Sequence, residues 1–166
     1  MRASRIALVL LAFPAIPAGE IALGLEEGAQ ADPQGPPLSV VVSKNSPVES
    51  LSLYELKHLY LGEYINGSDG KRLIPLNRAF GSSERVGFDA AALGMSPDQA
   101  TAYWIDRRIR GQSGSPRAIA QADLAQRIVG HLEGGITYVR PDELRPDVKV
   151  VRIDSKLPSD PGYRIR

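Results

Sequence analysis

Three consecutive valines, Val40 to Val42, form a β-branched run in the first third of the sequence. A strand with one face in water alternates apolar and polar residues, whereas a continuous apolar run is typical of a strand covered on both faces. We therefore expect a strand over 38–43, inside a sheet with helices on both sides. The rest of the chain must supply those helices and the neighbouring strands.

A capping box predicts where the first helix begins. Ser52 and Glu55 have the S-x-x-E spacing, in which each side chain accepts a hydrogen bond from a backbone N–H group at a helix start. The pattern predicts a helix over 53–61, ended by Gly62. Its expected buried stripe consists of Leu53, Leu56, Leu59 and Tyr60.

Two further helices and three strands continue the alternation. Ser96 as N-cap and Pro97 at the first helical position predict a helix that runs to about Arg110, and a second helix is expected over 123–132. Strands are expected over 117–120, 136–139 and 148–153. In the helix from Ser96, Ala102, Ile105 and Ile109 fall on one face. In the helix over 123–132, Leu124, Ile128 and Leu132 share a face that we expect to be buried. Alternating strands and helices predict an α/β fold, a single layered domain with a mixed β-sheet flanked by helices.

Basic residues gather where the helix from Ser96 ends. Arg107, Arg108 and Arg110 lie in its last turn, where cations complement the helix dipole, and this explanation is favoured over a binding patch. The loop that follows, GQSGSP over 111–116, is consistent either with a loop that closes over a ligand or with an ordinary linker.

The segment 73–94, LIPLNRAFGSSERVGFDAAALG, combines a short strand, a turn and a helix. Leu73, Ile74 and Leu76 are apolar enough for a strand, which Asn77 and Arg78 close. We expect the strand to lead directly into a turn of small residues.

Gly81, Ser82 and Ser83 form that turn, because glycine tolerates strained dihedrals and a serine hydroxyl accepts from free amides. The helix is expected to begin near Ser83 and to end at Gly94. Its unpaired N–H groups and partial positive charge could hold an oxyanion, with Arg78 adding a two-pronged hydrogen bond. Ordinary helix capping beside a surface arginine explains the same residues, and the pattern alone leaves both interpretations open.

The turn resembles the R-x-x-G-S-G-T turn of the phosphate-binding proteins of ABC transporters, in the type 2 periplasmic binding protein superfamily. The match is carried by Arg78, Gly81 and Ser82, while Ser83 replaces the second glycine and Glu84 replaces the threonine.

Two other segments are similar to the same family, in the same order. GGITYV at 134–139 is similar to a G-A-I-G-Y-V strand, with Thr137 in place of a glycine. Upstream, NSPVESLSLYELKHLYLGEY looks like the segment N-P-V-x-x-L-[ST]-x-x-E-L-x-x-I-[FY]-x-G, through Asn45, Pro47, Val48, Leu51, Ser52, Glu55, Leu56, Leu59, Tyr60 and Gly62. The resemblance covers roughly 38–153.

The resemblance implies one lobe of a type 2 periplasmic binding protein that binds phosphate or a similar oxyanion, with Arg78, Gly81, Ser82 and Ser83 as ligand residues. It implies no enzyme activity and no cofactor, and its expected partners are an ABC transporter permease, another envelope protein or a second copy of the chain. Two departures stand against it: the chain supplies one of the family's two lobes, and Glu84 places a negative charge beside the anion. The alternative is an interaction module of the cell envelope that has lost anion binding.

The N-terminus has the pattern of a secretory signal. Arg2 and Arg5 precede an apolar run over 6–13, and Ala29-Gln30-Ala31 forms an A-x-A cleavage site, with Ala18 as a second candidate. We expect a signal peptide over 1–31, a disordered lead over 32–37, the binding-protein-like domain over 38–154 and a loosely attached tail over 155–166. The expected location is the periplasm.

Composition excludes several classes of protein. The 166 residues include no cysteine, so neither a disulfide framework nor a thiolate zinc site is available. His58 and His131 are the only histidines, and they lack zinc-binding spacing. We find neither a G-x-S-x-G elbow nor a P-loop, and we expect no catalytic and no metal site. A formal net charge of +1 gives no indication of a nucleic-acid partner.

Overall fold

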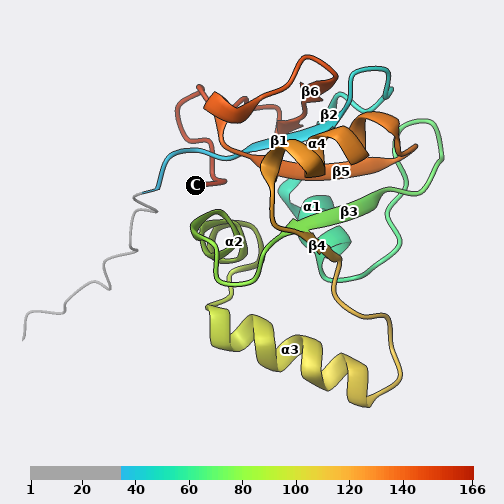
Figure 1. Ribbon diagram of the computed structural model, residues 1–166, viewed down its shortest axis with the longest axis vertical. Coiled ribbons are helices and arrows are strands. Elements are labelled where there is room, and N and C mark those ends of the chain that lie inside the picture. Colours follow the sequence, from blue (N-terminus) through green and yellow to red (C-terminus); the bar gives the residue numbers. More distant parts are fainter. Residues whose placement is uncertain (1–34) are drawn as a thin grey trace, which may run out of the picture. The chain divides into compact units, whose positions relative to one another are not determined.

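The computed structural model describes residues 35–166 (Figure 1). The signal peptide expected over 1–31 and residues 32–34 of the expected lead lie outside the described residues. Within 35–166, no helix combines the length and the apolar character needed to cross a membrane.

The main sheet is mixed, as the sequence predicts. Strand β1 lies antiparallel to β5 and β6, whereas β3 lies parallel to β4 and β5. The strand order is β4-β3-β5-β1-β6, and a second, two-stranded sheet pairs β2 with β7. The strands are β1 (Ser39–Ser43), β2 (Ser50–Leu51), β3 (Ile74–Arg78), β4 (Arg117–Ile119), β5 (Gly135–Val139), β6 (Val148–Val150) and β7 (Arg152–Ile153).

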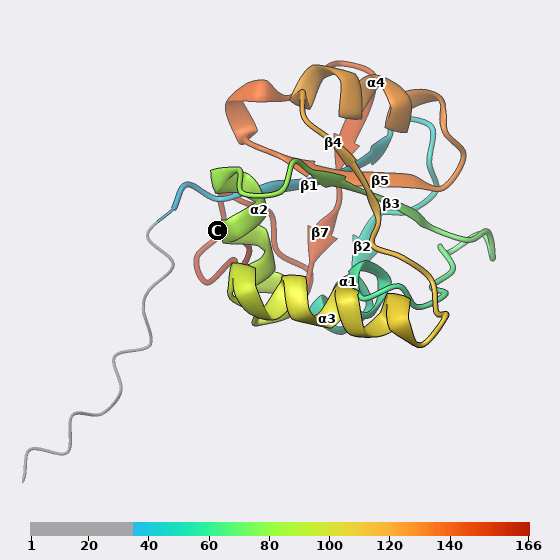
Figure 2. The same ribbon diagram turned by 60° about the horizontal axis from the view of Figure 1, so that its bottom comes forward.

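Helices cover both faces of this sheet (Figure 2). The expected capping box is present: the Ser52 hydroxyl accepts from Glu55 N, and the Glu55 carboxylate accepts from Ser52 N. Gly94 ends the segment that follows β3 in the left-handed conformation, with φ of 70°. The helices are α1 (Leu53–Tyr60), α2 (Ser83–Phe88), continued by a π-helical stretch η1 (Asp89–Leu93), α3 (Pro97–Ile109), α4 (Ala122–His131) and the 3₁₀ turn η2 (Pro141–Glu143).

The valine run divides the core into two clusters, as a strand covered on both faces requires. Val40 and Val42 face the cluster that contains residues of α1 and α2, which we call the α1-side cluster. Val41 faces the cluster that contains residues of α4, the α4-side cluster. All three valines are buried. The expected α/β fold is therefore confirmed.

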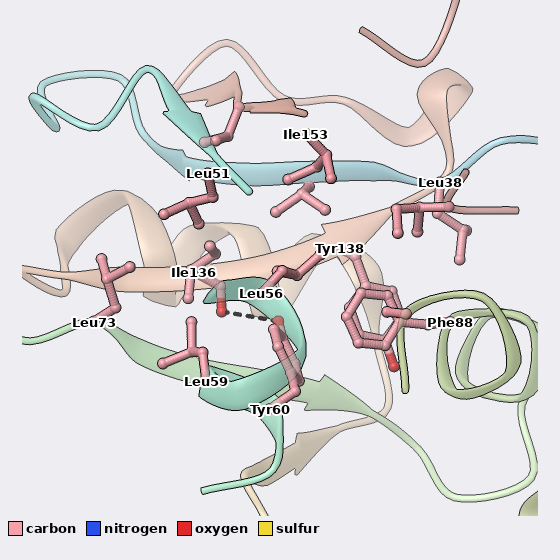
Figure 3. Close-up of a cluster of buried hydrophobic side chains, with 14 of the residues drawn as sticks. Leu38, Leu51, Leu56, Leu59, Tyr60, Leu73, Phe88, Ile136, Tyr138 and Ile153 are labelled. Carbon is pink, nitrogen blue, oxygen red and sulfur yellow. Dashed lines mark hydrogen bonds between the residues drawn. The ribbon is translucent and has the colours of Figure 1, made fainter. Parts of the chain in front are cut away.

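Three aromatic rings form the centre of the α1-side cluster (Figure 3). The rings of Phe88 and Tyr138 are stacked with centroids 3.9 Å apart, and the ring of Tyr60 lies 4.6 Å from that of Phe88. The Tyr60 hydroxyl donates to the backbone oxygens of Leu76 and Ile136. These rings join α1, α2 and the sheet directly behind the turn that follows β3.

The segment expected as one strand over 148–153 is divided between the two sheets. It forms β6 beside β1 and, after Val151, β7 beside β2. The Val151 N–H donates to Val40 O, and the next N–H, of Arg152, donates to Glu49 O. The single-strand prediction is wrong because alternation within a segment carries no information about which strand pairs with it.

The C-terminal segment is packed into the domain rather than loosely attached. Tyr163 and Ile165 are buried in the α1-side cluster. The Tyr163 hydroxyl donates to Leu38 O over 2.8 Å, and Leu38 N donates to Ile165 O over 2.9 Å. The few apolar residues of this segment, Leu157, Tyr163 and Ile165, are scattered among polar ones, and this pattern is too weak to predict the docking.

In α3 and α4, the helix face that packs against the core is not the face that apolar spacing indicates. In α4 the buried residues are Ala125, Gln126 and Val129, whereas Leu124 is 40% exposed. The face is rotated because Gln126 is held inside by Glu143 O and Arg145 N. In α3 only Ala100 is buried, and the face of Ala102, Ile105 and Ile109 points outward.

Candidate functional site

The candidate site begins where β3 ends. Strand β3 lies between β5 and β4 and runs parallel to both, with Arg78 opposite Ile119 of β4. The carboxyl ends of parallel strands in an open α/β sheet are the usual place for ligands. The expected strand over 73–76 is extended in the structure to Arg78, so Asn77 and Arg78 belong to the sheet and are buried.

Arg78 is 5% exposed, although the sequence suggested a residue at the surface end of a strand. Its Nη1 donates to the backbone oxygen of Ile119 over 3.3 Å. Its Nε is buried and has no hydrogen-bond partner among the described residues. The guanidinium thus makes one hydrogen bond to the sheet while its buried Nε has no acceptor among the described residues, which is a costly arrangement unless something accepts from it.

The turn after Arg78 presents backbone N–H groups. Gly81 has a φ of +80°, a conformation that favours glycine. Ser82 is the N-cap of α2, and its Oγ accepts from Arg85 N over 3.3 Å. No hydrogen bond among the described residues uses the N–H of Gly81 or of Ser83. The four residues predicted to bind an anion therefore lie between the end of β3 and the start of α2, with unused N–H groups at two of them.

A buried polar network supports this turn from behind. The Tyr138 hydroxyl donates to Asn77 Oδ1, and the same oxygen accepts from Arg78 N over 3.1 Å. Burial raises the pKa of Tyr138 well above its ordinary value, so the hydroxyl remains a donor at physiological pH. Asn77 Nδ2 is buried without a partner among the described residues. Sequence reasoning missed this role of Asn77, because Asn after an apolar strand is typical of a turn.

Glu84 lies at the same helix N-terminus and is mostly buried, its side chain 13% exposed. A hydrogen bond from its own backbone N–H lowers the pKa of Glu84, and Ser83, Arg140 and Arg78 lower it further, while desolvation opposes them. The Ser83 hydroxyl donates to its carboxylate over 3.3 Å, and Arg140 Nε lies 3.7 Å away. The carboxylate thus already uses part of the positive potential that an anion would use.

A buried ion pair that sequence reasoning missed lies one turn into the helix. Arg85 Nε and Asp89 Oδ2 are 2.6 Å apart, and both side chains are almost fully buried. Arg85 also lines a pocket of about 200 Å³ between the turn and α3, together with Phe80 and Trp104. Ser115 and Pro116 of the 111–116 loop line the same pocket. This places the end of that loop next to the candidate site.

Other chemistry is not visible near the turn. The described residues contain no group of three or more His, Asp or Glu side chains that could hold a metal ion. His58 contacts Glu63 at the end of α1, and His131 is an exposed residue at the end of α4. Neither histidine belongs to the turn.

No family model and no curated protein matches this chain. Several solved structures, however, have a similar fold. An ABC-type phosphate transport receptor from Vibrio cholerae is 16% identical, with a TM-score of 0.59 over 74% of this chain and 48% of that one. PstS from Borrelia burgdorferi is 11% identical, with a TM-score of 0.57 over 74% of this chain and 49% of that one.

A third structure was solved with bound phosphate. It is a candidate phosphate ABC transporter substrate-binding protein from Clostridium perfringens, 19% identical, with a TM-score of 0.57 over 72% of this chain and 45% of that one. The chain spans about half the length of the solved structures that it matches. Its fold is therefore similar to about half of a phosphate ABC transporter substrate-binding protein, as the fold of a single lobe would be.

Proposed function

We propose that this protein is a periplasmic binding-protein-like domain that binds a small oxyanion, with phosphate as its ligand, through Arg78 and the turn 81–83. The observation that carries the proposal is the buried Arg78 side chain, whose Nε has no partner among the described residues. A buried unpaired guanidinium donor implies an acceptor. A phosphate oxygen is a suitable acceptor, because arginine binds oxyanions through paired N–H groups.

The turn supplies further donors of the right kind. The N–H groups of Gly81 and Ser83 and the hydroxyl hydrogen of Ser82 lie within six residues of Arg78, at the start of α2. Helix N-termini bind phosphate and sulfate because their free amides and the helix dipole favour negative charge. The similarity to phosphate transport proteins, one of them with bound phosphate, supports phosphate over other oxyanions.

The expected affinity is modest. An anion at this turn would meet the Glu84 carboxylate, and the exposed Gly81 and Ser83 would leave it partly in water, where its hydrogen bonds compete with solvation. A permease of a phosphate ABC transporter, another envelope protein or a second copy that covered the turn would exclude that water. The N-terminal signal pattern supports a periplasmic location, where such partners occur.

The test is a titration of the ¹⁵N-labelled protein with phosphate, followed by NMR. Saturable shifts in the amide signals of Gly81, Ser82 and Ser83 are expected, with little change at Gly67 and Gly70 in the distant turn before β3. Shifts that centre elsewhere, or that increase linearly with phosphate and never saturate, would contradict the proposed site.

An interaction module that has lost anion binding is the second candidate function, and it too has structural support. Phe80, inside the turn, is 65% exposed, and Ile105 and Ile109 of α3 are 54% and 80% exposed. Exposed apolar residues that lie close together are typical of a protein-binding surface. If phosphate gives no response at the turn, this function remains.

A further inference from the structure

The outward face of α3 carries a regular stripe. Asp98, Ala102, Ile105 and Ile109 follow one another at spacings of four, three and four residues, so they lie on one side of the helix. All four are exposed, and Ala100 is the only residue of the 13 in α3 that is buried. Figure 1 shows α3 along the lower edge of the described domain, with nothing from 35–166 on its outer side.

The apolar surface continues onto the turn after β3. Phe80 and Ile105 line the same pocket, together with Thr101 on the adjoining side of α3. Phe80, Ile105 and Ile109 are each more than half exposed. The apolar stripe of a helix normally packs against the core of its own domain. The stripe of α3 is exposed instead, which is typical of a surface that binds another protein. This surface, Phe80 with the α3 stripe, is the α3 patch.

Charge is distributed unevenly along the α3 patch. Asp98 lies in the first turn of α3, and Arg108 and Arg110 lie at its end. Among the described residues, neither Asp98 nor Arg108 forms an ion pair, while Arg110 pairs with Asp106 in its own helix. An acidic start and a basic end complement a second identical helix only when the two run antiparallel, which also aligns their dipoles favourably.

We infer that the α3 patch is a homodimer contact, in which α3 packs antiparallel against α3 of a second copy about a two-fold axis. Such a contact is self-complementary, since each copy offers the same surface to the other. With the axis between residues 103 and 104, the small Ala102 lies opposite the large Ile105 of the second copy. Asp98 then lies opposite Ile109 of the second copy, beside its Arg108.

This contact rests on α3 and Phe80 and is independent of the proposed anion binding. An interface of one helix per copy is at the small end of the range, so we expect reversible association in the micromolar range. The contact would also bring Phe80, and with it the anion-binding turn, to the edge of the interface.

The experiment is sedimentation velocity of the full chain in phosphate-free buffer over a series of concentrations. The wild type is expected to shift from monomer toward dimer. Ile105→Asp should weaken association at least tenfold, whereas Leu144→Asp, a matched apolar-to-acidic change at an exposed leucine outside the α3 patch, should leave it unchanged. Circular dichroism of each variant checks that α3 is still helical.

Charge reversal tests the antiparallel arrangement. Asp98→Arg and Arg108→Asp should each weaken self-association, and the two single variants mixed together should form a heterodimer, because each then supplies the charge that the other lacks. The double variant should associate as the wild type does. Three results would overturn the inference: a wild type that stays monomeric at every concentration, an Ile105→Asp variant that dimerises as the wild type does, or single charge variants that do not associate when mixed. A monomeric wild type would indicate that the α3 patch binds a different protein.

Discussion

The guanidinium of Arg85 and the carboxylate of Asp89 form an ion pair inside the protein, with Nε and Oδ2 2.6 Å apart. The two side chains are 6% and 3% exposed and lie one turn apart in the helical segment whose start forms the candidate site. Burial raises the pKa of Asp89, and the hydrogen bond and charge of Arg85 oppose that rise. The pair therefore links α2 to η1 within the helical segment that follows the proposed anion-binding turn, and breaking it would leave a buried charge without a partner.

Breaking this pair should destabilise the fold strongly. Asp89→Ala leaves the Arg85 charge buried without its partner and should lower the free energy of unfolding by about 3–5 kcal/mol. Replacing both residues, with Arg85→Met and Asp89→Leu, should recover most of that loss, because no uncompensated charge remains. Urea denaturation measures both variants, and a single variant that loses less than about 1 kcal/mol would show that water reaches the pair.

Anion binding should depend on the shape of the Arg78 side chain as well as on its charge. Arg78 is buried and supports Ile119 O, so alanine would disturb the fold, whereas lysine keeps the charge and most of the stem. Because lysine has no planar pair of donors, Arg78→Lys should weaken phosphate binding by roughly tenfold, about 1.4 kcal/mol. Calorimetry measures the affinity, and Arg117→Lys, at an exposed arginine of the adjacent strand, is the matched control. Unchanged affinity in Arg78→Lys would remove Arg78 from the site.

Removing the negative charge of Glu84 should strengthen anion binding. Its carboxylate lies at the N-terminus of α2, and a unit charge a few ångströms away in a wet site contributes about 1 kcal/mol of repulsion. Glu84→Gln should therefore bind phosphate several-fold more tightly, while Glu133→Gln, at an exposed position beside Lys71, should not change the affinity. Weaker binding in Glu84→Gln would instead indicate that Glu84 accepts a hydrogen bond from the ligand.

The same residue should contribute to acid stability. The folded state lowers the pKa of Glu84, so its ionised form is favoured by folding. That contribution is complete above the unfolded pKa of about 4.3 and is lost as the pH falls through the lowered folded value. Thermal unfolding of wild type and Glu84→Gln should differ near pH 7 and converge toward pH 3. Curves that stay parallel over this range would contradict the lowered pKa.

Two leucine substitutions test the observed helix faces. Leu56 of α1 is fully buried, and Leu56→Ala should lower the free energy of unfolding by about 2–5 kcal/mol. Leu124 of α4 is 40% exposed, and Leu124→Ala should change it by no more than about 0.5 kcal/mol. Chemical denaturation compares the two variants. A loss of unfolding free energy in Leu124→Ala as large as that in Leu56→Ala would show that Leu124 is buried, as apolar spacing predicts.

Local signals in the sequence predicted the parts of the fold that depend on local chemistry. The capping box at Ser52 and Glu55 fixes the start of α1, and the valine run 40–42 identifies a strand with a cluster on each face. Gly94 ends its helix as predicted, because the backbone there has a left-handed conformation, which glycine adopts without steric strain. In each case neighbouring residues along the chain determine the conformation.

What the sequence could not predict depends on distant partners. Asn77, Arg85 and Asp89 carry no local signal of burial, because polar side chains usually lie at the surface, yet all three are buried. Ile165 is also buried, and its backbone oxygen accepts from Leu38, more than 120 residues earlier. Apolar spacing in α3 identified a face correctly but not whether that face meets the core. The four candidate anion-binding residues were predicted together because they are close in the sequence, between the end of β3 and the start of α2.

The most direct test of the account is a calorimetric titration of the protein with phosphate and then with sulfate, with its oligomeric state measured by sedimentation in the same buffer. We predict saturable heat with phosphate at concentrations below about 1 mM, a free energy of binding more favourable than about −4 kcal/mol. We also predict that Arg78→Lys weakens this binding and Arg117→Lys does not. No heat from the folded wild type at millimolar phosphate would contradict anion binding and leave protein interaction as the function of this domain.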